Sequence, residues 1–345
     1  RRMAASGYEI THFSCGFKDS EPEKTIDGVR YVRGSQNPLK VLLDARKYYR
    51  ENSSFDWVVD QRNTHHFFTN HWLPKHQKRA LFVHQTTREL WHSEFPWGLS
   101  HIGLWHEHYT LRKTKHYPVI TVSPSTRDEL VRDFGYSEEN IAVFHEGLSK
   151  SPPPLESLPP KFEEPTFIYV GRFSRYKGID AAIEAFALFY LKYGQGQMYI
   201  TGKKNEKFER EIWTPLKKKY DFLQSRVTIT GFVSEARRDE LMARSHAILV
   251  PSQREGWGLI ITEANAQNTP AIVYPSPGIR DAVALGKTGL ISKEKTPESL
   301  FEEMVKLWED TALREDLTQK ARTWSEDFSW DKAGDQGIAF FASKS

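Results

Sequence analysis

The sequence predicts an α/β protein of two domains, and three observations lead to this class. Short apolar, β-branched runs alternate with longer amphipathic stretches, which is the pattern of βα units built on parallel sheets. At 345 residues the chain exceeds what one hydrophobic core usually organises. A proline-rich stretch at 149–160 divides the units into two series, and its prolines exclude a helix or a central strand. We therefore expect doubly wound domains at 1–148 and 161–326, joined by this linker.

The first domain is predicted to carry a series of parallel strands. They are expected at Glu9–Phe13, Trp57–Asp60, Ala80–His84, Val119–Val122 and Ile141–Phe144. A doubly wound domain normally opens with a strand and a glycine-rich turn, whereas this sequence opens in what looks like a helix. Either the first strand and its glycine-rich loop are missing from this sequence, or the site at that edge is built differently.

The second domain is predicted to start a fresh series of strands after the linker. They are expected at Thr166–Val170, Met198–Thr201, Val227–Thr230, Ala247–Val250 and Ala271–Val273, with a helix at Ile179–Tyr193. Open α/β domains bind ligands beyond the carboxyl ends of their parallel strands. The turns that follow these strands are therefore where we expect a site.

Composition excludes several classes of protein. Hydrophobic residues make up 39% and charged residues 27%, as in soluble globular proteins, and no apolar run approaches the roughly 18 residues that span a bilayer. No apolar segment follows Arg1 and Arg2, so no secretory signal is visible, and a single cysteine, Cys15, fits a reducing compartment. The net charge of +3 is too small to indicate a nucleic-acid partner. We expect a cytoplasmic protein that does not bind nucleic acid.

Basic and aromatic residues gather in the first half of the sequence. The basic clusters are Lys75, Lys78 and Arg79, then Arg112, Lys113 and Lys115. They could meet the anionic inner face of a membrane or an acidic acceptor, or form a solvated helix face. Trp91, Trp97 and Trp105 could line an acceptor groove, touch an interface or pack in the core. The histidines of 91–108 lack an HExxH spacing or a cysteine partner, so no metal site is expected there.

The turn after the strand Thr166–Val170 carries groups that suit a diphosphate. The sequence continues Gly171-Arg172-Phe173-Ser174-Arg175-Tyr176-Lys177-Gly178 before the next helix. Gly171 lets a ligand approach the backbone, Arg172 offers a planar fork of donors, and Lys177 offers a compact positive charge. Taken alone, an arginine and a lysine at a strand end are more often solvated surface residues than ligands.

The turn after the strand Ala247–Val250 adds glycines and carboxylates. Gly256 and Gly258 precede an apolar helix, an arrangement that presents backbone N–H groups and a positive helix end to an anion. Glu255 and Glu263 lie eight residues apart, about 12 Å if helical throughout. That exceeds the roughly 5–9.5 Å between the paired carboxylates of glycosidases. Two separated carboxylates suit two polyols on one ligand, whereas a surface residue and a helix-face residue are the alternative.

Order and spacing give this region a resemblance to a known family. From about Thr166 to Asp310 the chain resembles the retaining glycosyltransferases of family 4, with the Gly-Arg and Lys-Gly turn, Gly231-Phe232-Val233 and the Glu-x7-Glu motif. The first half resembles the family more loosely, through Val83-His84, Ile120-Thr121-Val122-Ser123 and Glu146-Gly147-Leu148, where the family often has Asn-Gly-Val. The resemblance implies the GT-B fold, in which two Rossmann-like domains face a deep cleft. It also implies that residues 327–345, which contain Phe328-Ser329-Trp330-Asp331, form a helix crossing back to the first domain.

The resemblance also implies roles for individual residues. Gly171, Arg172 and Lys177 would hold the donor diphosphate, and Glu263 would hold the ribose. Glu255 would bind hydroxyls of the donor sugar, which His84 would face from the first domain. The base would meet the backbone near Phe232 and Val233, and the amides near the sugar and phosphate would be those of Gly256, Trp257, Gly258 and Leu259.

The activity implied by the resemblance is a metal-independent transfer of a glucose-type hexose, with retention, to a hydroxyl acceptor. UDP is the expected nucleotide of the donor, and no cofactor or metal is expected. The acceptor could be a glycan, a lipid-linked molecule or a small molecule, and a peripheral membrane contact is left open. An epimerase acting on sugar nucleotides and a catalytically silent binding subunit remain the alternatives.

Overall fold

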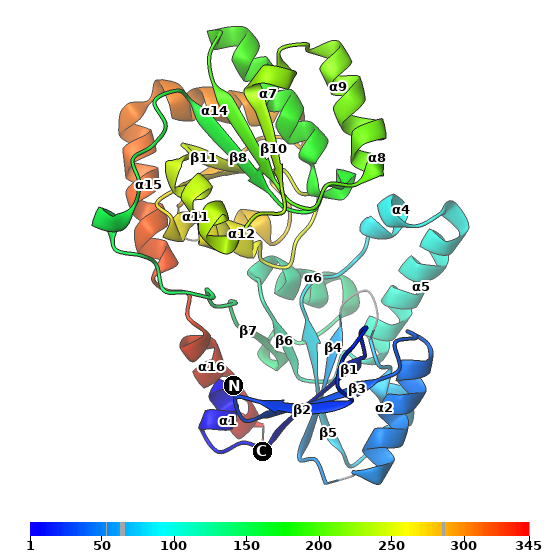
Figure 1. Cartoon of the computed structure of the whole chain (residues 1–345). Coiled ribbons are helices and arrows are strands. Elements are labelled where there is room, and N and C mark those ends of the chain that lie inside the picture. The colour runs from blue at the N-terminus through cyan, green and yellow to red at the C-terminus, as the bar shows by residue number, and fades with distance from the viewer. Residues whose placement is uncertain (53, 63–65, 285–286, 345) are drawn as a thin grey trace. The chain divides into compact units, whose positions relative to one another are not determined.

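The computed structural model describes residues 1–52, 54–62, 66–284 and 287–344, and it divides into two units (Figure 1). Unit 1 comprises Arg1–Arg88, Gly98–Gly147 and Trp330–Ser345, and unit 2 comprises Glu89–Trp97 and Leu148–Ser329. Each unit is therefore built from separate stretches of the sequence. A short stretch from the first half of the chain belongs to unit 2, and the C-terminal stretch belongs to unit 1.

Unit 1 contains two separate sheets. The larger is parallel throughout, in the order β4 (Trp57–Arg62), β5 (Lys78–Val83), β6 (Val119–Thr121) and β7 (Ile141–Val143). The smaller has the order β1 (Ile10–Cys15), β3 (Val29–Gly34) and β2 (Glu23–Ile26), with β1 parallel and β2 antiparallel to β3. The first domain was expected to hold a single series of parallel strands, and the second sheet corrects that expectation.

Helices cover the sheets of unit 1. They are α1 (Arg2–Ala5), α2 (Lys40–Glu51), α3 (Thr69–Trp72), all but the first residue of α5 (Trp97–Lys113), α6 (Pro124–Phe134) and α16 (Trp330–Ser343), with a 3-10 turn at Glu138–Asn140. The helix α6 begins where Ser123 Oγ accepts a hydrogen bond from the N–H of Thr126, and it ends at Gly135 in the left-handed conformation. The C-terminal α16 packs against α1, and Phe340 joins Ala80 of β5 in the core.

Unit 2 is built on one parallel sheet of six strands. Its order is β10 (Val227–Gly231), β9 (Gln197–Thr201), β8 (Thr166–Val170), β11 (Ala247–Val250), β12 (Ala271–Val273) and β13 (Gly289–Ile291). The order runs backwards from β10 to β8 and forwards from β11 to β13. The carboxyl ends of β8 and β11 flank this reversal, which is where doubly wound sheets bind their ligands.

The helices of unit 2 bury a large apolar core against this sheet. They are α4 (Leu90–Glu94), α7 (Ile179–Tyr193), α8 (Glu206–Phe208), α9 (Thr214–Lys219), α10 (Leu223–Arg226), α11 (Glu235–Arg244), α12 (Leu259–Ala266), α13 (Ile279–Ala284), α14 (Pro297–Glu309) and α15 (Thr311–Ser325), with a π turn at Glu209–Trp213 and 3-10 turns at Leu155–Ser157 and Arg175–Lys177. Ile183 and Phe186 of α7 are fully buried together with Phe167 and Met198 of the sheet. Among the described residues, no helix is both long and apolar enough to cross a bilayer.

The sequence predicted most of these elements. The strands Thr166–Val170, Ala247–Val250 and Ala271–Val273 and the helix Ile179–Tyr193 are confirmed to the residue. Strands β2, β3 and β13 were not predicted, because β2 and β3 carry charged residues and β13 has only three residues. The linker was expected to contain no helix, and this is wrong at one point, the single 3-10 turn Leu155–Ser157.

The end of the linker is fixed to unit 2 by one side chain. The ammonium of Lys161 donates to the carbonyl oxygens of Ser245 at 2.7 Å and Asn268 at 2.9 Å, and to the hydroxyl of Thr269 at 2.8 Å. These acceptors lie just before β11 and β12. An ammonium has three hydrogens, so all of its donors are used to join three segments of the chain.

We expect Lys161→Met to destabilise unit 2. Methionine cannot donate a hydrogen bond, so the carbonyl groups of Ser245 and Asn268 lose this donor. Burial lowers the pKa of Lys161 to about 7, so near neutral pH the loss lies between that of neutral hydrogen bonds, about 0.5–1.5 kcal/mol each, and that of charged ones, about 1.5–3 kcal/mol. Urea denaturation followed by tryptophan fluorescence measures it. Lys218→Met changes an exposed lysine of the same unit and should leave the midpoint in place. Equal midpoints for both variants would contradict the role given to Lys161.

Candidate active site

The turn after β8 is held in place by buried aromatic side chains. Tyr169 is buried and its hydroxyl donates to the carbonyl oxygen of Arg172 at 2.8 Å. The guanidinium of Arg172 donates to the hydroxyl of Tyr176. The ring of Tyr176 also lies 5.4 Å from the Arg172 guanidinium and 5.3 Å from the Lys177 ammonium. One aromatic side chain thus holds both predicted diphosphate ligands at the carboxyl edge of the sheet.

Two glycines allow neighbouring turns to approach the loop after β11. Gly178 has φ +69°, and a Cβ there would lie 2.1 Å from the carbonyl oxygen of Pro251. Gly278, in the turn after β12, has φ +78°, and a Cβ there would lie 2.2 Å from the carbonyl oxygen of Glu255. Any side chain at either position would force the loop after β11 out of place.

This approach brings Lys177 and Glu255 into contact. The ammonium of Lys177 donates to a carboxylate oxygen of Glu255, and the two side chains are only 20% and 18% exposed. The backbone supports the contact, because the N–H of Gln253 donates to the carbonyl oxygen of Tyr176 at 2.8 Å. Two residues that the resemblance assigned to adjacent parts of the donor, the diphosphate and the sugar, therefore form one ion pair, and Arg172 of the same turn is exposed.

The helix α12 starts directly after this loop. Its N-cap, Gly258, has φ +87°, so the chain turns sharply and the first backbone N–H groups of the helix are directed back along the loop. The side chain of Trp257 is 1% exposed, and its ring lies 5.6 Å from that of Phe328. The indole is therefore part of the core, and only the backbone of Trp257 is available to a ligand.

Glu263, on the second turn of α12, borders a cavity of about 270 Å³. Its carboxylate lies 3.6 Å from the guanidinium of Arg238 on α11. Burial raises the pKa of Glu263, which the charge of Arg238 partly opposes. Residues of the linker, among them Ser149 and Lys150, also line the cavity. The hollow is close to the lower end of the roughly 300–1,000 Å³ usual for small-molecule sites.

The turn after β10 presents an exposed aromatic ring. Phe232 is 89% exposed, and Val233 beside it is half-buried. Gly231 has φ +72° with open space around the position of a Cβ. An aromatic side chain left in solvent at the carboxyl edge of the sheet offers a flat apolar surface to a ligand.

His84 belongs to unit 1, just after β5, which ends at Val83 rather than at His84 as predicted. Its Nδ1 lies 3.7 Å from a carboxylate oxygen of Glu146, which follows β7 in the same unit. The ring of Phe82 lies 4.3 Å from that of His84. Burial lowers the pKa of His84, so that its imidazole is neutral at pH 7.

Two family models match the chain one after the other. The model of Glycosyltransferase Family 4 matches residues 1–151, and that of Glycosyl transferases group 1 matches residues 156–324. The chain belongs to the GT4-type glycosyltransferase family. The boundary between the two matches falls within the proline-rich linker of this glycosyltransferase.

Similarities in sequence and in structure to known proteins are consistent with this family. Glycogen synthase of Mycobacterium tuberculosis is 27% identical over 216 residues, which cover 61% of this chain and 50% of that protein. The chain thus spans about half the length of that relative. Sucrose-phosphate synthase from Thermosynechococcus elongatus has a similar structure, with a TM-score of 0.81 at 20% identity over 99% of this chain and 90% of the other. The Anabaena protein HepE, solved with UDP and glucose, has a TM-score of 0.69 at 16% identity over 91% and 86% of the two chains. These neighbours establish the GT-B fold.

The sequence did not predict a buried arginine in the loop between β11 and α12. The side chain of Arg254 is 5% exposed and donates to both carboxylate oxygens of Glu89, at 2.9 and 3.2 Å. Burial raises the pKa of Glu89, but Arg254, a backbone hydrogen bond and Lys295 together outweigh that effect, and the pKa is lowered overall. No local pattern in the sequence indicates this contact, because the partners lie 165 residues apart.

The three tryptophans of the first half differ in burial. Trp91 is half-buried in α4 and its ring lies 5.0 Å from that of Phe95, whereas Trp97 and Trp105 are 81% and 66% exposed. Core packing is therefore wrong for Trp97 and Trp105.

In the described part of the chain, no three His, Cys, Asp or Glu side chains form a group that could hold a metal ion.

We expect Gly278→Ala to disrupt this site, because the new methyl group would displace the loop that carries Glu255. Gly194→Ala is the matched control, since Gly194 also has a positive φ, +66°, but has open space around it. The strained conformation alone costs about 1–2 kcal/mol for a non-glycine residue. Gly278→Ala should lose clearly more stability than Gly194→Ala in urea denaturation. Equal losses would contradict the close approach of the two loops.

Proposed function

We propose that this glycosyltransferase moves a glucose-type hexose from a UDP-sugar to a hydroxyl acceptor, with retention at the anomeric carbon and without a metal ion. The proposal rests on one observation, the placing of Arg172 and the Lys177–Glu255 pair beside the first turn of α12 at the carboxyl edges of β8 and β11. Fixed positive groups at a helix N-terminus suit a diphosphate. The UDP and glucose bound by HepE support the choice of donor.

Each part of the donor has residues of suitable chemistry. Arg172 and Lys177 bind the diphosphate, with Gly171 allowing it to approach the strand end. Glu255 accepts hydrogen bonds from the sugar hydroxyls. The amides that face the sugar and phosphate are those of Gly256, Trp257, Gly258 and Leu259. The cavity beside Glu263 takes the ribose, and the base lies against the backbone near Phe232 and Val233.

The reaction exchanges one C–O bond for another at the anomeric carbon. The bond to the diphosphate oxygen breaks, the bond to the acceptor oxygen forms on the same face, and the acceptor's proton passes to the departing phosphate. Negative charge gathers on the diphosphate as its bond loosens. Arg172, Lys177 and the amides of α12 are fixed before the reaction, so they stabilise that charge without reorganising.

The proposed acceptor is the hydroxyl of a glycan, a lipid-linked molecule or a small molecule. An epimerase on the same fold would release an isomer of the donor without an acceptor, and a silent binding subunit would release nothing. Incubation with UDP-glucose and a panel of acceptors, followed by NMR of the products, separates the three. A glycosylated product that keeps the donor's anomeric configuration supports the proposal, whereas an isomerised donor or no product overturns it.

We expect Arg172→Ala and Lys177→Ala to lower kcat at saturating donor, because both side chains act on charge that develops in the transition state. Loss of one preorganised donor typically costs about 10²–10³ in rate. Arg175→Ala is the control, since this exposed arginine of the same turn faces Asp180 at 3.8 Å. EDTA should leave the turnover of the wild type unchanged. Full activity in both variants, or loss of activity with EDTA, would contradict the proposed mechanism.

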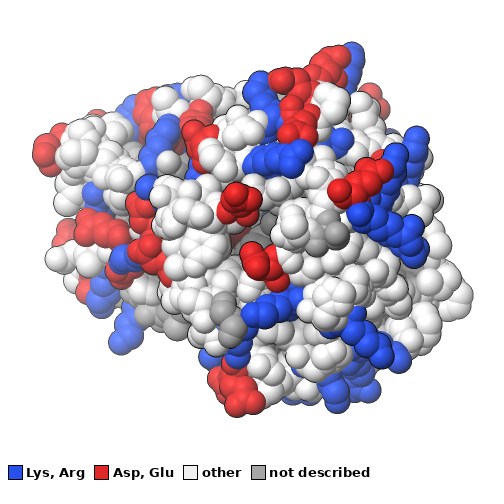
Figure 2. All heavy atoms as spheres, turned by 90° about the horizontal axis from the view of Figure 1, so that it is seen from below, with Lys and Arg blue, Asp and Glu red and all other residues white. Residues whose placement is uncertain are grey.

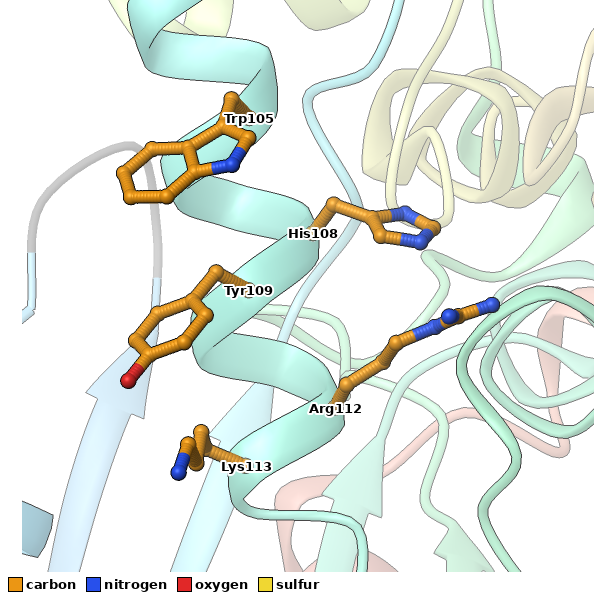
Figure 3. Close-up of a pocket in the computed structure, with 5 residues that line it drawn as sticks. All are labelled: Trp105, His108, Tyr109, Arg112 and Lys113. Atoms are coloured by element: carbon orange, nitrogen blue, oxygen red, sulfur yellow. The ribbon is translucent and has the colours of Figure 1, made fainter.

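We further propose that the protein is cytoplasmic and contacts the anionic inner face of a membrane through α5. This helix buries Ser100, Glu107 and Thr110, while Ile102 and Trp105 are 63% and 66% exposed. Leu99 and Tyr109 extend the exposed apolar stripe, and Figure 3 shows Trp105, Tyr109 and Lys113 on one side of the helix, with Arg112 on another. A helix with apolar residues outward and flanking cations suits an anionic lipid interface.

The distribution of charged side chains on the face in Figure 2 and the net charge of the chain do not favour a nucleic-acid partner. On the face shown in Figure 2, acidic and basic side chains are interspersed without a continuous basic area. The net charge is only +3. A nucleic-acid site would need clustered cations along a groove or helix.

We expect the protein to sediment with vesicles that contain phosphatidylglycerol, and less with phosphatidylcholine vesicles. Ile102→Ser combined with Trp105→Ser should abolish the binding, because it removes the apolar area that enters the lipid. Leu191→Ser is the control, since Leu191 is a 60% exposed leucine of unit 2. Binding that survives the double variant, or no binding by the wild type, would overturn the membrane proposal. If light scattering shows a dimer for the wild type and a monomer for the double variant, the exposed stripe serves self-association instead.

A further inference from the structure

A carboxylate that the sequence comparison treated only as a deviation lies beside the predicted active-site histidine. Glu146 follows β7 as His84 follows β5, and β6 lies between these two parallel strands. Both residues therefore project from the carboxyl edge of the same sheet. The side chain of His84 is 32% exposed and that of Glu146 is 22% exposed, with 3.7 Å between Nδ1 and the nearer carboxylate oxygen.

The two groups do not form a buried ion pair at rest. Burial lowers the pKa of His84 and raises the pKa of Glu146, so each shift favours the neutral form of its group. Among the described residues, no other charged group adds to either shift. A distance of 3.7 Å is longer than a hydrogen bond. Burial therefore favours a neutral imidazole at His84 and opposes the ionisation of Glu146.

Neighbouring side chains restrict which groups can form a hydrogen bond with the His84 ring. The adjacent ring of Phe82 packs against the imidazole and limits its rotation. His145, next to Glu146, instead turns its Nδ1 to the carbonyl oxygen of Val122 at 3.1 Å. A small side-chain rotation would bring Glu146 from 3.7 Å into the range of about 2.7–3.2 Å from Nδ1. Catalytic hydrogen bonds are often long before the substrate binds and shorten in its complex.

We propose that Glu146 positions His84, by accepting a hydrogen bond from Nδ1–H and leaving Nε2 as the acceptor for a hydroxyl of the transferred sugar. A neutral imidazole has two tautomers, and the group bound at one nitrogen decides which nitrogen carries the proton. With its proton on Nδ1, His84 can only accept at Nε2, so it selects a sugar with a hydroxyl at that position. This inference rests on the proposed function and on the family resemblance, which implies that His84 faces the donor sugar.

The chemistry of a carboxylate suits this role. An asparagine carbonyl in its place would be a weaker acceptor, and the amide group of asparagine can equally donate to an unprotonated Nδ1. Glutamate lacks that second option while it is ionised.

NMR of the protein labelled with ¹⁵N-histidine tests the pairing without any need for activity. The ring signals of His84 are identified by their loss in His84→Gln. We expect the wild type to show His84 with its proton on Nδ1, and Glu146→Ala to shift the proton towards Nε2. Glu139→Ala, which changes an exposed carboxylate of the same unit, should leave the tautomer unchanged. The same tautomer in the wild type and in Glu146→Ala overturns the proposal.

Kinetics test the consequence for the sugar. Glu146→Ala should lower kcat/KM by about 10- to 100-fold, the size of effect seen when the group that orients a metal-binding histidine is removed. Wild-type activity should fall on the acidic side as Glu146 and His84 become protonated, and His84→Gln should lose this dependence. Glu146→Ala with wild-type kcat/KM contradicts the role. An inactive wild type whose His84 tautomer still depends on Glu146 would reject the proposed function and keep the pairing.

Discussion

The close approach of the loops after β8, β11 and β12 is the constraint on which the candidate site depends. It is possible only because residues 178 and 278 are glycines, since a Cβ at either position would meet a carbonyl oxygen of the loop after β11. The approach brings Lys177 within reach of Glu255, although 78 residues separate them in the sequence. The buried Arg254 fixes the same loop from its other side.

This constraint has an electrostatic consequence. The Arg172 and Lys177 cations lie over the same tyrosine ring and repel one another, and Glu255 neutralises only one of them. An anion with two charged groups would relieve this repulsion, which is why a diphosphate suits the site better than a single carboxylate. Since the positive groups are already in position, little of the binding free energy is spent on ordering them.

The part of the site that could be predicted from sequence is the part that recurs as a local pattern. The Gly-Arg and Lys-Gly turn and the Glu-x7-Glu spacing each lie within one loop or one loop and helix, so strand ends and helix geometry locate them. The contact between Glu89 and Arg254 could not be predicted, because it joins residues from different halves of the chain. Nor could the burial of Trp257, because the ring of Phe328 that packs against it comes from the far end of unit 2. Glu146 was visible only as a deviation from a motif, since its partner His84 lies on another strand.

Calorimetric titration of UDP into the wild type and into Glu263→Gln tests the central claim most directly. The glutamine keeps the size of the side chain, but its carbonyl oxygen is an uncharged and weaker acceptor for ribose hydroxyls beside the cavity. Hydrogen bonds to a charged group contribute about 1–1.5 kcal/mol more than neutral ones, so the variant should bind UDP about 5- to 10-fold more weakly. Glu240→Gln, on the same cavity wall, should bind UDP like the wild type. Equal affinities for wild type and Glu263→Gln, or no binding of UDP by the wild type, would contradict the assignment of this edge of unit 2 to a nucleotide sugar.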